Sequence, residues 1–291
     1  MNEFKNLLTY DQKEANVFVC GIPTDRNVIL NRGSVNAPHT LRTLSYNLAP
    51  TDVGGTFLDK IKVYDCGDYA AEDFNKLTTE LQFNFLSKDG FHVIFGGDHS
   101  TTIAAERAFY CKCLKMNREP VIIHLNSHLN FFEVYKDNVF SSACNVYRAN
   151  EYGYDDHNIA LIGVRSFEKD EIELLKKHKS IDVFKAVDVK KLGVEDLLKY
   201  LINKYSSDNN LVYLSLDMDV VDPSFAPGVE NPVPFGLTNY EVAALLSGLT
   251  SGLNVDVLDL VEVAPNYDIN NITSLLALKL LYEVFSSINK K

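Results

Sequence analysis

The sequence predicts an α/β protein in which a parallel sheet is covered by helices on both faces. Short runs rich in Val and Ile alternate along the chain with longer segments whose apolar residues recur every three or four positions. The apolar runs are nearly continuous, which is typical of strands buried on both faces. No low-complexity linker and no shift in composition divides the chain. We therefore predict a single domain that spans residues 1–291.

The first half of the chain is expected to supply four strands and three helices. The predicted strands are "NVFVCGI", "KIKVYDCGD", "FHVIFGGD" and "PVIIHLN", at residues 16–22, 60–68, 91–98 and 120–126. Each is a short apolar run that ends near a turn-forming or polar residue. Between them, apolar residues at helical spacing predict helices near residues 35–48, over 72–88 and over 100–117.

The second half opens with a segment rich in Asn, Tyr and Ser, residues 131–157, which we predict to be a loop. Loops of this length often carry function. The same patterns then predict four more strands, at residues 158–164, 181–186, 210–217 and 255–263. They also predict four helices, around residues 168–178, near 194–204, and over 238–249 and 272–288.

Composition excludes several classes of partner. The chain has 28 Lys and Arg against 39 Asp and Glu, so its formal net charge is -11. Such a chain repels nucleic acid and anionic membranes, and we expect neither as a partner. No apolar run reaches the roughly 18 residues that a membrane helix needs, and the N-terminal segment has no signal-peptide core. The five scattered cysteines include no Cys-x-x-Cys pair, so we expect reduced thiols, no zinc site and a cytoplasmic location.

Polar clusters follow four of the predicted strands, where parallel sheets bind their ligands. The segment "GGDHS" places Asp98 and His99 after two glycines that permit a tight turn. In "SLDMDVVDPSFAPG", Asp217 and Asp219 lie on one face of a strand, so their carboxylates require a cation or a shared proton. Two other interpretations stay open: Asp98 or Ser100 caps a helix, and the aspartate pair is a solvated strand end.

The other two clusters follow the strands at residues 120–126 and 255–263. The segment "HLNSHLN" alternates four polar side chains onto one face of a strand, namely His124, Asn126, His128 and Asn130. Glu262 ends an apolar run, a setting that raises a carboxyl pKa and suits acid–base chemistry or cation binding. His124 is equally well explained as a hydrogen-bonded strand histidine, and Glu262 as part of a salt bridge.

These segments, in this order, resemble the ureohydrolase family, which includes arginase, agmatinase, formiminoglutamase and guanidinobutyrase. The resemblance covers most of the chain and rests on "GIPTD" with "RGSVNAPHTLR", "VYDCGD", "GGDHS", "SLDMDVVDPSFAPG" and "VEVAPNYD". It implies a three-layer α/β/α sandwich with an eight-stranded parallel sheet, assembled into trimers or hexamers. It also implies hydrolysis of guanidino or formimino groups by two Mn²⁺ ions bridged by hydroxide.

The resemblance implies six metal-ligand positions, which in the family are two histidines and four aspartates. In this chain they fall on His99, Asn126, His128, Asn130, Asp217 and Asp219. Two of the six are amides, which are neutral and whose NH₂ end cannot coordinate a metal. Two doubly charged ions about 3.5 Å apart at an effective dielectric near 20 repel by on the order of 19 kcal/mol. We therefore expect no full two-manganese site, and either no metal or a single weakly bound divalent ion, most readily Mn²⁺, at His128, Asp217 and Asp219.

Other positions also depart from the family pattern. Ser142 stands where the family has a histidine in the long loop, and Glu230 adds an acid near the mouth of the site. We expect both to contact a substrate. If the chain is active, the resemblance assigns the substrate cation to Glu262 and the orientation of a ligand to Asp98.

Two functions compete on these observations. The first is a ureohydrolase-like protein without two-manganese hydrolysis, which acts as a binding, regulatory or structural subunit in a homo-oligomer or beside an active paralogue. The second is an active hydrolase of a linear amidine, of the arginase, agmatinase or formiminoglutamase type, with one metal or a different one. Both allow a small cationic guanidino or amino ligand. A plain binding module is a third interpretation, which the sequence does not separate from the first.

Overall fold

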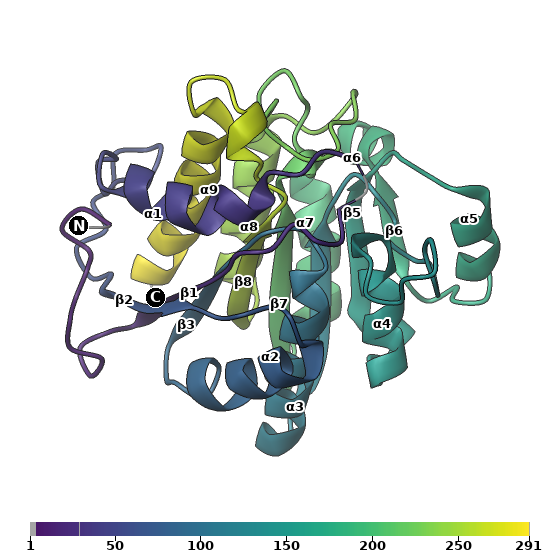
Figure 1. The fold of residues 1–291 in the computed structure, drawn as a ribbon, viewed down its shortest axis with the longest axis horizontal. Coiled ribbons are helices and arrows are strands. Elements are labelled where there is room, and N and C mark those ends of the chain that lie inside the picture. Colours follow the sequence, from purple (N-terminus) through teal and green to yellow (C-terminus); the bar gives the residue numbers. More distant parts are fainter. Residues whose placement is uncertain (1–3, 29, 291) are drawn as a thin grey trace.

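Eight strands form one sheet, and all neighbouring pairs run parallel. The structure is a computed structural model that describes residues 4–28 and 30–290. The strand order across the sheet is β2-β1-β3-β8-β7-β4-β5-β6 (Figure 1). The strands are β1 Val17–Ile22, β2 Val63–Asp68, β3 Phe91–Gly96, β4 Glu119–Leu125, β5 Ile159–Val164, β6 Asp182–Lys185, β7 Asn210–Asp217 and β8 Val255–Val261. The expected eight-stranded parallel sheet is thus confirmed.

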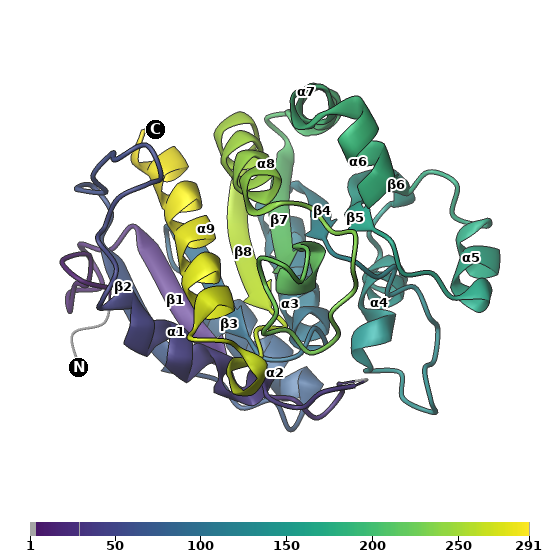
Figure 2. The ribbon, with the colours of Figure 1, turned by 90° about the horizontal axis from the view of Figure 1, so that it is seen from above.

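The helices form two layers, one on each face of the sheet (Figures 1 and 2). Helices α1, α6, α7, α8 and α9 pack on one face, and α2, α3 and α4 pack on the other. The α-helices are α1 Ala37–Ser45, α2 Phe74–Glu80, α3 Thr101–Met116, α4 Asn145–Tyr152, α5 Lys169–Leu175, α6 Ala186–Leu192, α7 Val194–Tyr205, α8 Asn239–Gly252 and α9 Ile272–Asn289. Short 3-10 helices cover Ser34–Asn36, Ser142–Cys144, Asp156–Asn158, Met218–Val220 and Pro265–Tyr267.

Successive side chains along each strand point to opposite faces of the sheet, so each helical layer packs on its own set of apolar side chains. On β1, Val17 and Val19 belong to the hydrophobic cluster beneath α1, α8 and α9, whereas Phe18 and Cys20 belong to the cluster beneath α2 and α3. All four side chains are buried. Because a fully buried Val or Phe contributes roughly 1.5–3 kcal/mol, both faces of the sheet favour the folded state. This is why the strands read as continuous apolar runs rather than as alternating ones.

Two helices were not expected from the sequence. Helix α4 lies inside residues 131–157, where we predicted a loop, and it buries Val146 and Ala149 one turn apart against the cluster beneath α2 and α3. Its C-terminal cap is Gly153 in the left-handed conformation, at φ 113°. Helix α6 follows β6 directly and buries Ala186 and Val189. Both helices are short, at eight and seven residues, so their helical pattern is weak in sequence.

Other predicted elements differ mainly at their ends. The helix expected over residues 72–88 is split into α2 and a π-helical turn, Leu81–Phe85. The strand expected over 255–263 ends at Val261, because Glu262 adopts a positive φ of 65°. Among the helices in the described part of the chain, none is long and apolar enough to cross a lipid bilayer.

Candidate functional site

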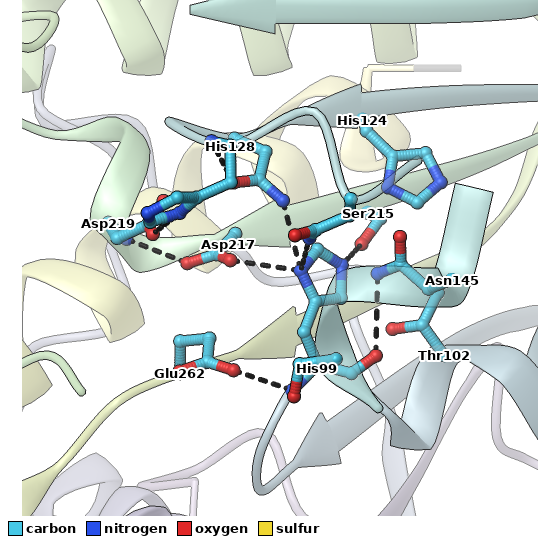
Figure 3. Close-up of polar contacts among 12 residues, drawn as sticks. His99, Thr102, His124, His128, Asn145, Ser215, Asp217, Asp219 and Glu262 are labelled. Atoms are coloured by element: carbon cyan, nitrogen blue, oxygen red, sulfur yellow. Dashed lines mark hydrogen bonds and ion pairs between the residues drawn. The ribbon is translucent and has the colours of Figure 1, made fainter. Parts of the chain in front are cut away.

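Four neighbouring strands bring the four polar clusters to one edge of the sheet. Strands β3, β8, β7 and β4 are adjacent in that order. Because all of them run parallel, the residues after their carboxyl ends meet at the same edge. Asp217 is the last residue of β7, and Asn126 and Glu262 directly follow β4 and β8, while His99 lies three residues beyond β3. Figure 3 shows His99 at the centre of the polar contacts that result.

These polar residues line a small cavity of about 20 Å³ that is partly open to solvent. This volume accommodates one water molecule or a group of similar size. The lining residues are His99, His128, Asn130, Ser142, Asp217, Asp219, Glu230, Asn231 and Glu262. The structure therefore brings together eight of the predicted site residues as lining, and Asn126 contacts His99 from outside the lining. Asn231 is the exception, because the sequence did not indicate it.

The turn that presents His99 depends on Gly97. A Cβ atom on Gly97 would lie 1.8 Å from the backbone oxygen of Thr24, so only glycine fits there. The backbone N–H of Glu262 donates to the oxygen of Gly97 at 2.9 Å, and the backbone N–H of His99 donates to Oε1 of Glu262 at 2.7 Å. This turn thus fixes the positions of His99 and Glu262 relative to each other.

His99 is buried, and both of its ring nitrogens have partners. Nδ1 lies 2.9 Å from Oδ2 of Asp217, and Nε2 lies 2.9 Å from Oγ of Ser215. Burial lowers the pKa of His99 well below its usual value, and the nearby ring of His124 lowers it further. The imidazole is therefore neutral, which is the form that binds metals.

Asp217 and Asp219 lie side by side, yet their pKa values are shifted in opposite directions. Burial and the neighbouring Asp219 raise the pKa of Asp217 well above its usual value. Burial would also raise the pKa of Asp219, but His128 and the backbone N–H of Ser127 outweigh it and lower that pKa to about 2. Asp219 is thus the ionised member of the pair, and it also accepts the N–H of Ser127 at 2.9 Å. Both carboxyl groups line the cavity, but Asp219 lies in the 3-10 helix Met218–Val220 rather than on a strand with Asp217, so the prediction of one shared strand face is wrong.

His128 forms an ion pair with Asp219. Its Nδ1 lies 2.8 Å from Oδ2 of Asp219. Burial lowers the pKa of His128, but this carboxylate has the larger combined effect and raises it. Its other ring nitrogen, Nε2, lies 2.9 Å from the side-chain nitrogen of Asn231. Both nitrogens of this imidazole therefore already have partners within the chain.

Asn126 and Asn130 direct their amide groups toward His99. Nδ2 of Asn126 lies 3.1 Å from Nδ1 of His99, and Nδ2 of Asn130 lies 3.4 Å from the same atom. The oxygen of Asn126 accepts the backbone N–H of His128 at 2.7 Å. This backbone hydrogen bond determines which end of the Asn126 amide faces the ring, because the oxygen is already used.

Glu262 and Glu230 bring two more carboxyl groups to the cavity. Burial raises the pKa of Glu262 well above its usual value, and the carboxyl groups of Glu230 and Asp217 raise it further. Burial also raises the pKa of Glu230, to about 7, against hydrogen bonds with Ser34 and Glu262. Oε1 of Glu230 accepts the backbone N–H of Ser34 at 3.1 Å. The two glutamates therefore form a hydrogen-bonded carboxyl pair.

Two other predicted site residues, Asp98 and Ser142, both contact the loop at Asn27, but only Ser142 lines the cavity. Asp98 is not among the cavity-lining residues: its carboxylate accepts the backbone N–H of Asn27 at 3.0 Å and that of Ser100 at 2.9 Å. It therefore ties the loop at Asn27 to the start of α3. Ser142 lines the cavity, and its hydroxyl donates to the oxygen of Asn27 at 3.2 Å.

The sequence did not indicate two residues that contact the site, Ser215 and Asn231. Ser215 lies two residues before Asp217 on β7, so strand alternation places both on one face, and this pattern was available in the sequence. Asn231 reaches His128 only because the loop after Gly228 folds back over the sheet edge. No local pattern predicts that path.

The ionisable side chains that line the cavity are those of His99, His128, Asp217, Asp219, Glu230 and Glu262. In the described residues, no group of three or more His, Cys, Asp or Glu side chains is arranged to hold a metal ion. His128, Asp217 and Asp219 are connected through Asp219, whose backbone N–H donates to Oδ1 of Asp217 at 2.9 Å. These three residues would be the nearest to a ligand set for a single ion.

Comparisons with known proteins agree with this arrangement of strands and motifs. The family model described as the arginase family matches residues 15–286. An agmatinase from Salmonella paratyphi B (strain ATCC BAA-1250 / SPB7) is 33% identical over 294 aligned positions, which cover 95% of this chain and 90% of that protein.

Solved structures show the same likeness. The agmatine ureohydrolase of Thermoplasma volcanium aligns with a TM-score of 0.86 and 29% identity, covering 99% of this chain and 94% of that chain. The formimidoylglutamase from Bacillus subtilis subsp. subtilis str. 168 aligns with a TM-score of 0.89 over 99% of this chain and 92% of that chain. Its identity is 20%, so the likeness concerns the fold alone.

Proposed function

Because this chain belongs to the arginase family, we propose that it is a member of that family without two-manganese hydrolysis. One observation carries the proposal. The oxygen of Asn126 accepts the backbone N–H of His128, and its NH₂ group points at Nδ1 of His99. An NH₂ group cannot coordinate a metal, so this side chain offers a donor where a ligand atom is needed.

The charge balance supports the same proposal. Two Mn²⁺ ions carry four positive charges, and the six implied ligand positions supply only two carboxylates, Asp217 and Asp219. Asp219 is already paired with His128 at 2.8 Å. The residues at these positions therefore do not fit a centre of two ions, which needs anionic ligands to offset its charge.

We infer a binding, regulatory or structural role on this basis. The chain would assemble as a trimer or hexamer of its own copies or beside an active paralogue, and its pocket would take a small cationic guanidino or amino ligand. The acidic cavity supports a cationic ligand, because carboxyl groups line it from β7, from the loop after Gly228 and from the end of β8. Five free cysteines among the described residues are compatible with a reducing, cytoplasmic setting.

Metal content tests the proposal directly. The purified chain is incubated with Mn²⁺, desalted and analysed by mass spectrometry beside an active agmatinase. We expect fewer than two ions per chain for this protein and about two for the active relative. Two bound ions per chain together with urea release from a guanidino compound would sink the proposal.

A second function is favoured by a separate observation: His128, Asp217, Asp219 and Glu262 all line one cavity. In that case the chain is a hydrolase of a linear amidine that uses one metal or a different one. His128, Asp217 and Asp219 would hold the ion, and a bound ion lowers the pKa of a coordinated water. Glu262 would accept hydrogen bonds from the substrate cation, while Asp98 would act through the loop at Asn27.

This alternative predicts measurable urea or ammonia release with one equivalent of metal. Asp219→Ala removes the partner of His128 and one of the three ligands, so it should abolish the activity. The exposed change Glu195→Gln on α7 serves as the control and should leave activity intact. Full activity in Asp219→Ala would refute the single-metal hydrolase.

A further inference from the structure

Cys20 of β1 and Cys66 of β2 lie opposite each other at one edge of the sheet. Strand β2 is the outermost strand in the order, next to β1. The register pairs on either side of Cys20 are Val19 with Asp65 and Gly21 with Asp68. One residue of β1 therefore faces two residues of β2, Cys66 and Gly67, which is a bulge. Gly67 has a φ of 77°, which glycine adopts without strain. Backbone pairing thus holds Cys66 beside Cys20.

The two cysteine side chains point to the same face of the sheet. Cys20 belongs to the hydrophobic cluster beneath α2 and α3, and Cys66 packs against that cluster. Burial raises the pKa of Cys20 well above its usual value, and Cys66 is the neighbouring group that raises it most. Neighbouring strands lie about 4.7–4.9 Å apart, which is inside the range of about 4.4–6.8 Å that separates the Cα atoms of disulfides. Strand pairing therefore gives these two thiols the approach that a disulfide needs.

The other three cysteines have different settings. Cys111 and Cys113 lie two positions apart on α3, where side chains do not face each other. The thiol of Cys144 donates to the oxygen of Asn138 at 3.6 Å. All five cysteines are free in the structure. The pair on β1 and β2 is therefore the pair that the fold aligns for oxidation.

We propose that glutathione disulfide converts Cys20 and Cys66 into a reversible disulfide that joins β1 to β2. The thiolate of Cys66 attacks one glutathione sulfur, the S–S bond breaks, and one glutathione thiolate leaves and takes up a proton. The thiolate of Cys20 then attacks the Cys66 sulfur and releases the second glutathione, which also takes up a proton. The two cysteines lose two electrons and two protons, and one glutathione disulfide becomes two glutathione thiols. Excess reduced glutathione reverses both steps.

Burial controls the rate of both steps. Cys66 is half-buried and reacts first, whereas Cys20 is buried and meets only a sulfur that its neighbour already carries. Burial raises the pKa of Cys66 to about 11, although Lys88 opposes this effect. At pH 7 the thiolate fraction is then on the order of 10⁻⁴, and it rises about tenfold per pH unit. The bond should therefore form slowly and act as a lasting lock on the edge strand β2. This inference does not depend on the proposed function.

Peptide mapping of the full, unaltered chain tests the inference. The chain is incubated with glutathione disulfide at about pH 9, where thiolate is more abundant, then alkylated in urea and digested with trypsin without reduction. Each cysteine lies in a tryptic peptide of its own, namely residues 14–26, 63–76, 108–112, 113–115 and 137–148. We expect mass spectrometry to find peptides 14–26 and 63–76 joined in most molecules. Glutathione on Cys66 without the bond to Cys20, or other pairs at equal yield, would overturn the inference.

Two controls show whether the fold selects this pair. In the chain unfolded by urea, the same treatment should spread the bonds over several cysteines, because the strands no longer align Cys20 with Cys66. An equal preference for this pair in the unfolded chain would mean that the fold does not cause it. Cys66→Ser should abolish the bond, whereas Cys111→Ser, which also replaces a half-buried cysteine, should leave its yield unchanged.

Stability shows whether the native strands accept the bond. The oxidised chain should unfold at a higher urea concentration than the reduced chain, because the bond restricts the unfolded state. Cys66→Ser, treated in the same way, should show no such shift. An oxidised chain with an equal or lower midpoint would contradict a bond between natively paired strands. Both the mapping and this comparison use the unaltered chain, so they decide the matter even if the variant does not fold.

Discussion

The side-chain nitrogen of Asn126 lies 3.1 Å from Nδ1 of His99. Because the oxygen of the same amide accepts the backbone N–H of His128 at 2.7 Å, both ends of Asn126 are used within the chain. A carboxylate at this position would keep the backbone hydrogen bond with one oxygen and present the second oxygen toward His99. The amide therefore presents an NH₂ donor toward His99, where a carboxylate would present an oxygen that can bind a cation.

Restoring the carboxylates should restore metal binding. In Asn126→Asp with Asn130→Asp, two added negative charges bring the ligand positions to four carboxylates, enough to offset two divalent ions. We expect the Mn²⁺ content after desalting to rise toward two per chain, measured by mass spectrometry. The single change Asn126→Asp should give an intermediate content.

The matched control for this pair is Asn203→Asp, an exposed position on α7. It adds a charge of the same kind far from the cavity lining and should leave the metal content unchanged. If the double variant binds no more Mn²⁺ than the control, the two asparagines are not what limits metal binding.

Gly97→Ala should destabilise the turn that presents His99. The new Cβ would lie 1.8 Å from the oxygen of Thr24, so the backbone must shift. We expect a loss of at least about 3 kcal/mol in the free energy of unfolding, measured with urea. Gly54→Ala, whose Cβ would approach no atom closer than 3.3 Å, should cost much less. Equal stability of the two variants would contradict the close approach.

Arg42→Met should destabilise the end of β2. The guanidinium of Arg42 bonds both carboxyl oxygens of Asp65, at 2.6 and 2.9 Å, and Oδ1 of Asp68 at 2.6 Å. Its side chain is 9% exposed. Removing one partner of a largely buried pair leaves an uncompensated charge, so we expect a loss of about 3 kcal/mol. Arg26→Met breaks only an exposed pair and should cost less than about 1 kcal/mol.

A double variant checks that the charge pair causes this loss. With Asp65→Asn already in place, Arg42→Met should cost less than it does alone, because only the half-exposed Asp68 is then left as an ionised partner. Additive losses in urea unfolding would argue that packing, rather than the charge pair, accounts for the effect.

Stability should fall as the pH falls from about 6.5 to 4, because of His92. Burial lowers the pKa of His92 to about 4, although Asp256 opposes this effect. In the unfolded chain a histidine has a pKa of about 6.5, so between these values the unfolded state binds more protons. The contribution is fully present above about pH 6.5 and is lost as the pH falls to about 4, by up to about 3 kcal/mol.

The measurement for His92 is the free energy of unfolding as a function of pH. His92→Leu should flatten the curve between about pH 4 and 6.5, whereas the exposed His39→Gln should leave its shape unchanged. If the unaltered chain and His92→Leu lose stability in parallel over this range, another group is responsible.

Much of the fold could be predicted from local patterns. Strand β1, for example, is apolar on both sides because Val19 and Cys20 face opposite helical layers. Helices α4 and α6 escaped prediction because segments of eight and seven residues show little periodicity, and contact with the sheet stabilises them instead. That residues 1–291 act as one domain stays a prediction.

By itself, the sequence determined the parallel sheet, the motifs at its edge and the presence of amides at positions 126 and 130. These follow from side-chain type and spacing, which are local properties. Only the tertiary structure decided which end of the Asn126 amide faces His99, that Asn231 enters the cavity, and that Glu230 bonds Ser34 there. Those relationships join residues up to 196 positions apart, as in the bond from Ser34 to Glu230, and no local pattern records a contact of that range.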